Sequence, residues 1–123
     1  MEKFEDTKEE FKSLGIPHGE IHAYHVTEKS RARKILKDNF NLEYENSGDY
    51  GIGHYFYELP NTELAHGKCL LCRILPGWEH RDSSDFDIPE GYHSKKVVRG
   101  LIGNVIVIEN PAQILPCFVM HFK

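Results

Sequence analysis

The residues of this chain that could do chemistry lie in four short segments. These are YHVT (24–27), GIGHYF (51–56), PEGYHS (89–94) and QILP (113–116). The imidazole of His25 can hold a hydroxyl group, and the ring of Tyr55 offers a flat apolar face. Taken singly, each side chain has a structural explanation, His25 as a half-buried histidine and Tyr55 as a core residue. Four such segments in a fixed order, however, favour a binding site.

The glycines of the second segment predict a tight turn. Gly51 and Gly53 carry no Cβ, so the backbone can bend sharply there and approach a ligand closely. This pair is not the dinucleotide-binding fingerprint of doubly wound folds, because Phe56 stands where a third glycine is required.

In order and approximate spacing, the four segments resemble the catalytic domain of the poly(ADP-ribose) polymerase family. The resemblance runs from about Glu20 to the C-terminus. The matching family motifs are His-Gly-(Ser/Thr), Gly-x-Gly-x-Tyr-Phe, Pro-x-Gly-x-(His/Asp)-Ser and Gln-(Ile/Val)-x-Pro. The resemblance implies an α+β fold of the ADP-ribosyltransferase kind, with a split, mostly antiparallel sheet and one or two helices. It also implies that NAD⁺ is the substrate.

The resemblance assigns a role to each matched residue. His25, aided by Thr27, would hydrogen-bond a ribose hydroxyl on the adenosine side of NAD⁺. Tyr55 would stack on the nicotinamide ring, and the backbone of Val26 would receive the carboxamide. Gly51 and Gly53 would let the backbone approach the ligand.

Two further contacts of the family have weaker counterparts here. The stretch between Tyr55 and Cys69 is short, and the serine that helps to hold the carboxamide has no clear match in it. Thr62 is the best candidate for that contact, and His66 is the candidate for a second stacking ring.

The expected reaction breaks the bond between nicotinamide and ribose and passes through a sugar cation. Family members that build polymers carry a glutamate eight residues before the glutamine of the last motif. Val105 stands at that position relative to Gln113, and a valine cannot activate an incoming hydroxyl. The resemblance therefore implies mono-ADP-ribosyl transfer to an unknown acceptor, expected to be a protein. Glu109 is no substitute, because it lies roughly 13 Å further along a strand.

Two alternatives stay open. The first is a catalytically inactive domain that binds NAD⁺, ADP-ribose or a protein partner. It is favoured by Val105 and by Val26, which replaces the glycine of the family. The second is an RNA 2′-phosphotransferase, and against it we find no basic pocket suited to RNA phosphates.

The composition argues against two classes of binding partner, nucleic acids and membranes. The net charge is −4, with 19 acidic and 15 basic residues, whereas a dedicated nucleic-acid surface normally shows a basic excess. The one basic cluster, within 29–37, suits the solvated side of a helix. No apolar run approaches the roughly 20 residues of a membrane span, and the acidic start lacks a signal-peptide core. We expect an intracellular protein, cytoplasmic or nuclear, without membrane or nucleic-acid partners.

No metal is expected. His66, Cys69 and Cys72 have an inviting spacing, but on a strand at 68–75 the two cysteines point to opposite faces. The acidic run at 82–87 lacks the glycine and terminal glutamate of a calcium loop. The cysteines are expected to be thiols.

The length of the chain predicts a single domain over 1–123. Within it we expect 1–19 to form an N-terminal helix and its lead-in, with no regulatory helical domain before residue 20. Helices are predicted at 2–14 and 28–38, the second capped by Thr27. Strands are predicted at 20–26, 54–57, 68–75, 103–109 and 113–122. Loops are predicted at 45–53 and 76–92, and a turn at Asn110-Pro111.

Overall fold

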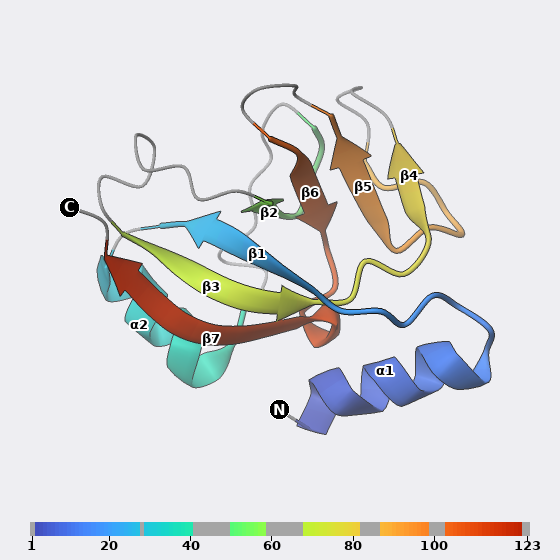
Figure 1. The fold of residues 1–123 in the computed structure, drawn as a ribbon, viewed down its shortest axis with the longest axis horizontal. Coiled ribbons are helices and arrows are strands. Elements are labelled where there is room, and N and C mark those ends of the chain that lie inside the picture. Colours follow the sequence, from blue (N-terminus) through green and yellow to red (C-terminus); the bar gives the residue numbers. More distant parts are fainter. Residues whose placement is uncertain are drawn as a thin grey trace.

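The computed structural model describes residues 2–27, 29–40, 50–58, 68–81, 87–98 and 103–121. These residues form an α+β structure with one seven-stranded, mostly antiparallel sheet and two α-helices, which confirms the predicted class (Figure 1). The helices are α1 (Glu2–Ser13) and α2 (Lys29–Asp38), with a short 3₁₀ helix η3 (Pro111–Gln113). The strands are β1 (Ile21–Val26), β2 (His54–Tyr57), β3 (Lys68–Ile74), β4 (Glu79–Arg81), β5 (Ser94–Val97), β6 (Val105–Ile108) and β7 (Ile114–His121).

The sheet has the strand order β4-β5-β6-β2-β1-β3-β7. Strand β1 pairs with β3 along its whole length, from Ile21↔Ile74 to Val26↔Cys69. Strands β1 and β2, in contrast, are in register only at Tyr24↔Tyr57. The half of the sheet that contains β3 and β7 therefore diverges from the half that contains β6, β5 and β4, as Figure 1 shows.

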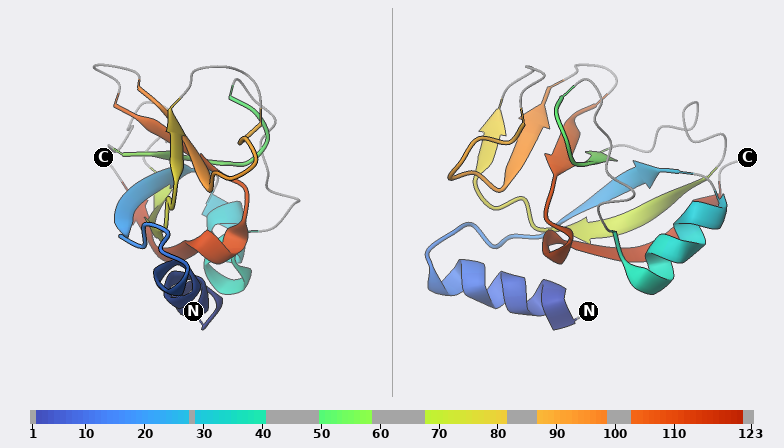
Figure 2. Two further views of the ribbon diagram at one scale, coloured as in Figure 1. Left: turned by 90° about the vertical axis from the view of Figure 1, so that its right-hand side faces the viewer. Right: turned by 180° about the vertical axis from the view of Figure 1, so that it is seen from behind.

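Helix α2 covers one face of the sheet, against β7 and β3 (Figure 2). Ala32 and Ile35 lie one turn apart on its apolar stripe and are fully buried. They pack on buried residues from five strands and on Phe40, which follows the helix. The residues of this core that come from the strands are Ala23, Phe56, Leu70, Cys72, Ile74, Ile106, Ile108 and Ile114.

Helix α1 packs elsewhere, through Phe4 and Phe11 against Leu75. Ionic contacts support this packing, because Glu20 accepts hydrogen bonds from Lys8 and from Arg73. These two bonds hold the pKa of Glu20 down, at about 2. Among the described segments, no helix is long and apolar enough to cross a membrane.

The predicted loop at 76–92 is wrong in part. Residues 79–81 form β4, which pairs in parallel with β5 from Glu79↔Ser94 to Arg81↔Lys96. Neither strand was predicted, because EHR and SKKV are short, polar and without apolar alternation. These two segments become strands because they pair with each other and because β5 also pairs with the apolar strand β6. The other predicted helices and strands are present, with ends that differ by one or two residues.

The turn predicted at Asn110-Pro111 is the start of η3. The side chain of Asn110 accepts a hydrogen bond from the backbone N–H of Ala112 at 3.0 Å, and Pro111 opens the helix. The predicted loop at 45–49 lies outside the described residues.

Candidate functional site

His25 lies on β1 just beyond the point where β1 and β2 stop pairing. Its Nδ1 is 2.8 Å from the main-chain carbonyl oxygen of Tyr55 on β2. A carbonyl can only accept, so Nδ1 must carry the proton and donate. The bond therefore fixes the tautomer, and Nε2 remains as a hydrogen-bond acceptor. No described residue is bonded to Nε2.

The surroundings of His25 keep the ring neutral. Its imidazole meets Phe40 edge-on, with ring centroids 4.9 Å apart, and lies 5.6 Å from the ring of Phe56. Burial among these rings lowers the pKa of His25 to about 4, and the nearby charge of Arg31 acts in the same direction. At neutral pH the side chain therefore presents an uncharged acceptor, which suits a hydroxyl group.

Tyr55 is buried with its hydroxyl group fully engaged. The hydroxyl donates to the carbonyl of Gly51 at 2.6 Å and accepts from the backbone N–H of Tyr50 at 2.9 Å. Its ring stacks on that of Tyr50, with centroids 6.2 Å apart and planes 28° apart. It packs in a cluster with Val97, Val105 and Val107. Tyr55 thus closes the turn that precedes its own strand.

The turn at 50–53 is also held from a distant part of the chain. The Nζ of Lys95 lies 3.3 Å from the carbonyl oxygen of Tyr50, and the N–H of Ile52 donates to Asp87 Oδ1 at 2.9 Å. These bonds therefore tie the start of the second segment to residues that flank the third segment, Asp87 before it and Lys95 after it. Lys95 is only 1% exposed, and its ammonium group is buried next to the Tyr55 cluster.

The two glycines of this turn serve different purposes. Gly51 has a φ of 94°, a left-handed conformation that other residues rarely adopt. Gly53 runs so close to β6 that a Cβ there would lie 2.7 Å from Val107 Cγ1. From the sequence we expect the backbone at Gly53 to approach a ligand closely. In the structure, the backbone at Gly53 approaches the neighbouring strand β6 instead.

Gln113 links the third segment to the fourth. Its side-chain Nε2 donates to the carbonyl of Leu75 at 2.8 Å and to that of His93 at 3.0 Å. His93 in turn accepts at Nδ1 from the N–H of Trp78 and packs on Phe11 of α1. The fourth segment therefore holds the loop before β5 in place.

Strand alternation separates the two side chains on which the predicted site depends. His25 shares a sheet face with Phe56 and α2, whereas Tyr55 shares the opposite face with Val105 and Val107. The structure brings the backbones of His25 and Tyr55 together and directs their side chains to opposite faces.

The remaining predicted residues lie around these two. Val26 and Thr27 are half-buried at the end of β1. Val105 is 1% exposed and lies directly opposite Tyr57 in register, on the Tyr55 face. Thr62 and His66 lie outside the described residues. Within the described chain, no group of three or more His, Cys, Asp or Glu side chains could hold a metal ion.

Sequence reasoning missed three residues that hold this region together, namely Phe40, Asp87 and Lys95. Phe40 follows a helix in a stretch without periodicity. Lys95 is one of two adjacent lysines, and nothing in the sequence shows which of them is buried. A lysine is normally exposed, so its burial is visible only in the structure.

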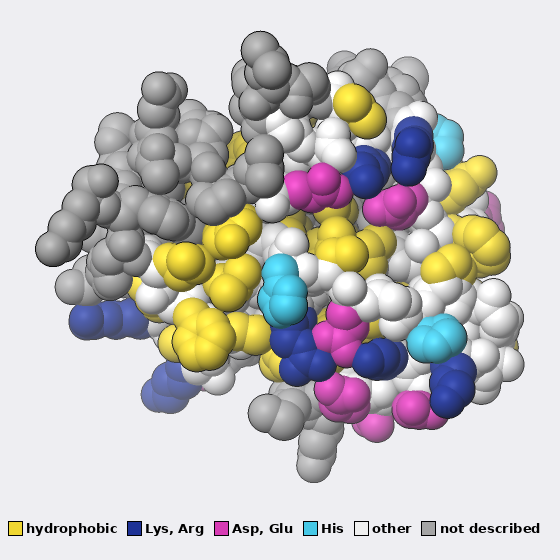
Figure 3. Space-filling model, viewed as in Figure 1, with side chains coloured by type: hydrophobic (Ala, Val, Ile, Leu, Met, Phe, Trp, Pro, Cys, Tyr) yellow, Lys and Arg dark blue, Asp and Glu magenta, His cyan; other side chains and the backbone are white. Residues whose placement is uncertain are grey.

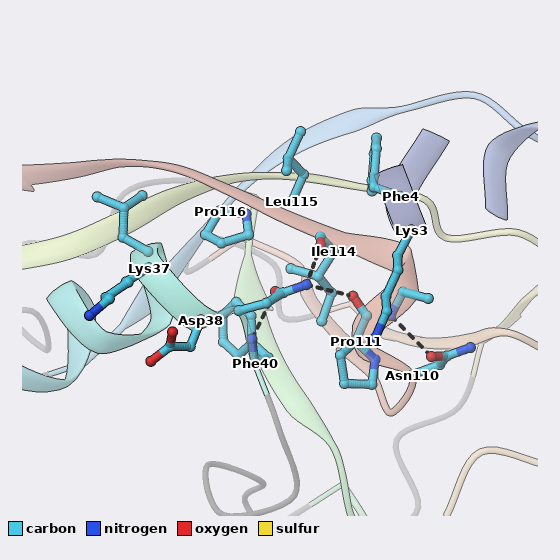
Figure 4. A pocket seen from close by; sticks show the side chains of 13 residues that line it. Lys3, Phe4, Lys37, Asp38, Phe40, Asn110, Pro111, Ile114, Leu115 and Pro116 are labelled. Carbon is cyan, nitrogen blue, oxygen red and sulfur yellow. Dashed lines mark hydrogen bonds between the residues drawn. The ribbon is translucent and has the colours of Figure 1, made fainter. Parts of the chain in front are cut away.

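Two hollows are described among the residues that the structure covers. The larger, the α1–α2 hollow of about 780 Å³, opens between Phe4, the end of α2 and η3, and it reaches Phe40 (Figure 4). Asn39 crosses its floor and donates to the carbonyls of Pro111 and Ile114. The smaller, the Glu109 hollow of about 430 Å³, lies between residues 88–93 and the junction of β6 with η3. Neither is lined by His25 or Tyr55 among the described residues.

The sheet face opposite α2 carries a row of apolar side chains. Tyr24, Leu71 and Phe118 are neighbours in register across β1, β3 and β7, and Phe118 is 64% exposed. Hydrophobic side chains gather over this part of the sheet in Figure 3. The row ends at Tyr57 on β2, directly opposite Val105.

Comparison with known proteins leaves the family open. No family model matches this chain, and no curated protein is significantly similar to it.

Proposed function

We propose that this chain is a mono-ADP-ribosyltransferase, which uses NAD⁺ to transfer one ADP-ribose unit to an acceptor and releases nicotinamide. One observation carries the proposal. His25 is held by Tyr55 O in the tautomer that presents Nε2 as a neutral acceptor, at the place where β1 and β2 part. A ribose hydroxyl is the kind of donor that such an acceptor binds.

The divergence of β1 and β2 supports an extended ligand. Beyond Tyr24↔Tyr57 the two strands share no pairing, and the proposal places the dinucleotide at this point. His25 would take the ribose on one face. On the other face, the ring of Tyr55, whose hydroxyl is already held by the turn, would meet the nicotinamide.

The end of β1 would complete the contacts. The backbone of Val26 would receive the carboxamide, because backbone N–H and C=O groups are available whatever the side chain. Thr27 follows directly and offers a hydroxyl beside it. Holding both ends of the ligand in this way fixes the reacting ribose and limits access of water to the developing sugar cation.

The burial of Val105 supports transfer of a single unit. Its side chain packs with Tyr55, Val97 and Val107, and the valine itself offers no group that could activate a second sugar hydroxyl. Chain elongation requires such a group in each round. A single transfer could instead use a general base supplied by the acceptor.

A second function is favoured by the same cluster. Val105 and Tyr55 are buried together in one apolar cluster. This packing also suits a domain that binds NAD⁺, ADP-ribose or a protein partner without catalysis. A transferase would bind NAD⁺ and turn it over, whereas a binding domain would not turn it over. Measuring NAD⁺ turnover therefore separates the two functions.

The test is incubation of the purified protein with NAD⁺ and candidate acceptor proteins, followed by intact-mass analysis and assay of free nicotinamide. Variants His25→Ala and Tyr55→Ala are compared with His22→Ala, an exposed histidine on the same strand. One added ADP-ribose mass that His25→Ala and Tyr55→Ala abolish, and His22→Ala retains, would support the transferase. Saturable binding without turnover would support the binding domain. Absence of both NAD⁺ turnover and NAD⁺ binding would refute the transferase and the NAD⁺-binding domain, and would leave only the domain that binds ADP-ribose or a protein partner.

A further inference from the structure

The α1–α2 hollow is an apolar groove between two helices. Buried Phe4, Phe40 and Ile114 line it, and Leu36 on α2, which is 41% exposed, adds to the same lining. A partner that covers the hollow removes this apolar surface from water, which favours binding. The charged side chains of the lining are Lys3, Lys37 and Asp38. The charges on the two bordering helices therefore decide which partner fits.

Helix α1 presents acids to solvent beside this hollow. Phe4 and Phe11 face the protein. The helical repeat directs Asp6, Glu9 and Glu10 away from it, and all three are exposed. None of the three forms an ion pair with a described residue. The exposed charged side chains described on α1 are the acids Glu5, Asp6, Glu9 and Glu10 and the bases Lys3 and Lys12. The outward face of α1 is therefore negative.

Helix α2 presents bases on the other side of the hollow. Ala32 and Ile35 face the sheet. Arg33, Lys34 and Lys37 point away from it, are exposed, and form no ion pair with a described residue. The exposed charged side chains described on α2 are the bases Arg31, Arg33, Lys34 and Lys37 and the acid Asp38. The outward face of α2 is therefore positive.

Both helices lie along the lower side of the molecule in Figure 1. Figure 3, in the same view, shows basic side chains at the lower left, over α2, and acidic side chains along the lower edge, over α1. The helices have 12 and 10 residues, or about 18 Å and about 15 Å, so their lengths match. A two-fold rotation about an axis that crosses the hollow places α1 of one copy over α2 of another. This side of the molecule is therefore complementary to itself.

We propose that the surface formed by α1, α2 and the hollow binds a second copy of this chain in a two-fold symmetric dimer. In this dimer α1 of each copy lies on α2 of the other, and the two hollows are buried between them. An acidic face meets a basic face twice, which is the self-complementary contact that two-fold symmetry requires. A wholly acidic partner, such as a nucleic acid, suits this surface less, because the outward face of α1 repels it. The inference does not depend on the proposed transferase function.

The test is sedimentation of the full chain over a range of concentrations. We expect a monomer–dimer equilibrium with a Kd on the order of 1–100 µM. Because salt screens exposed charges, the Kd should rise about tenfold or more between about 50 mM and about 500 mM NaCl. A chain that stays monomeric at about 1 mM protein would overturn the proposal.

Charge reversal locates the contact. The variant Asp6→Lys/Glu9→Lys makes the outward face of α1 basic like that of α2, and Lys34→Glu/Lys37→Glu makes the outward face of α2 acidic like that of α1. Each variant alone should dimerise about tenfold more weakly or not at all, because like charges then face each other. An equimolar mixture of the two should form a heterodimer, since each acidic face again meets a basic one. Recovery in the mixture also shows that both variants are folded.

The matched control is Glu79→Lys/Glu90→Lys. It reverses two acids in and after β4 that do not line the hollow, and it should leave the Kd unchanged. A dimer that neither helix variant weakens would overturn the proposal. So would a mixture that stays monomeric, or a control that weakens the dimer as much as Asp6→Lys/Glu9→Lys does.

Discussion

The imidazole Nδ1 of His25 donates to the main-chain carbonyl of Tyr55 at 2.8 Å, and this bond spans the gap where β1 and β2 diverge. The His25 side chain replaces a backbone hydrogen bond of the sheet, because it donates to the Tyr55 carbonyl that faces the neighbouring strand. The same bond sets the tautomer of His25. The divergence of the sheet and the chemistry of the proposed site therefore depend on one interaction.

Removing this bond should cost stability as well as ligand binding. His25→Ala leaves the Tyr55 carbonyl without its donor, and we expect the free energy of unfolding to fall by about 1–3 kcal/mol. His25→Asn can place an amide N–H near Nδ1 and should recover part of that loss, but it lacks an equivalent of Nε2. Urea unfolding of the three proteins measures the effect. Equal stability of wild type and His25→Ala would show that the bond contributes nothing.

The stability of the protein should depend on pH through His25. The pKa of His25 is about 4 in the folded chain, against 6.5 for an unperturbed histidine. Between these values the unfolded chain binds more protons, so stability is complete above pH 6.5 and falls as the pH drops toward 4. The loss should reach about 2–3 kcal/mol.

The difference between wild type and His25→Asn isolates this contribution. Burial also lowers the pKa of His93, but that effect is common to both proteins and cancels. Glu20, with a pKa of about 2, titrates in a more acidic range, below 4.5. Thermal unfolding at several pH values from 7.5 to 4 measures the difference. Parallel curves for the two proteins would contradict the assignment.

Gly53 should tolerate no side chain. In Gly53→Ala the new Cβ would lie 2.7 Å from Val107 Cγ1 and 3.1 Å from the carbonyl oxygen of Ile108, so β2 and β6 must separate. We expect a loss of about 1–3 kcal/mol in the free energy of unfolding. Gly19→Ala is the control, because a Cβ there would contact nothing within 4 Å. A similar effect of both substitutions would argue against the close approach of Gly53 to β6.

On the proposed function, introducing at Val105 the glutamate that polymer-forming poly(ADP-ribose) polymerases carry should not confer polymer synthesis. Val105→Glu would bury a carboxylate among Tyr55, Val97 and Val107, and we expect destabilisation by about 3 kcal/mol or more. Val98→Glu, at a position that is 64% exposed, should be nearly neutral. Chemical denaturation of both variants, with gel analysis of products formed from NAD⁺, makes the comparison. A stable Val105→Glu protein that forms polymer would overturn this picture of the cluster.

Local patterns in the sequence were sufficient for most of the secondary structure. The apolar stripe with Ala32 and Ile35 predicts α2, and the apolar runs within 68–75 and 103–109 predict two strands. These signals are local, because a residue's place on a helix stripe or strand face follows from its neighbours along the chain. They led to the α+β class. They also placed His25 and Tyr55 on strands, as the structure does.

Only the tertiary structure decided how these residues face one another. The register Tyr24↔Tyr57 directs the rings of His25 and Tyr55 to opposite faces, and the pairing of β5 with β6 buries Lys95. The parallel pair of β4 and β5 likewise has no local signal. Strand pairing joins segments far apart in the chain, and a shift of one residue would reverse every side chain on a strand. The tautomer and low pKa of His25 arise from such contacts, so they follow from the fold rather than from the motif that contains it.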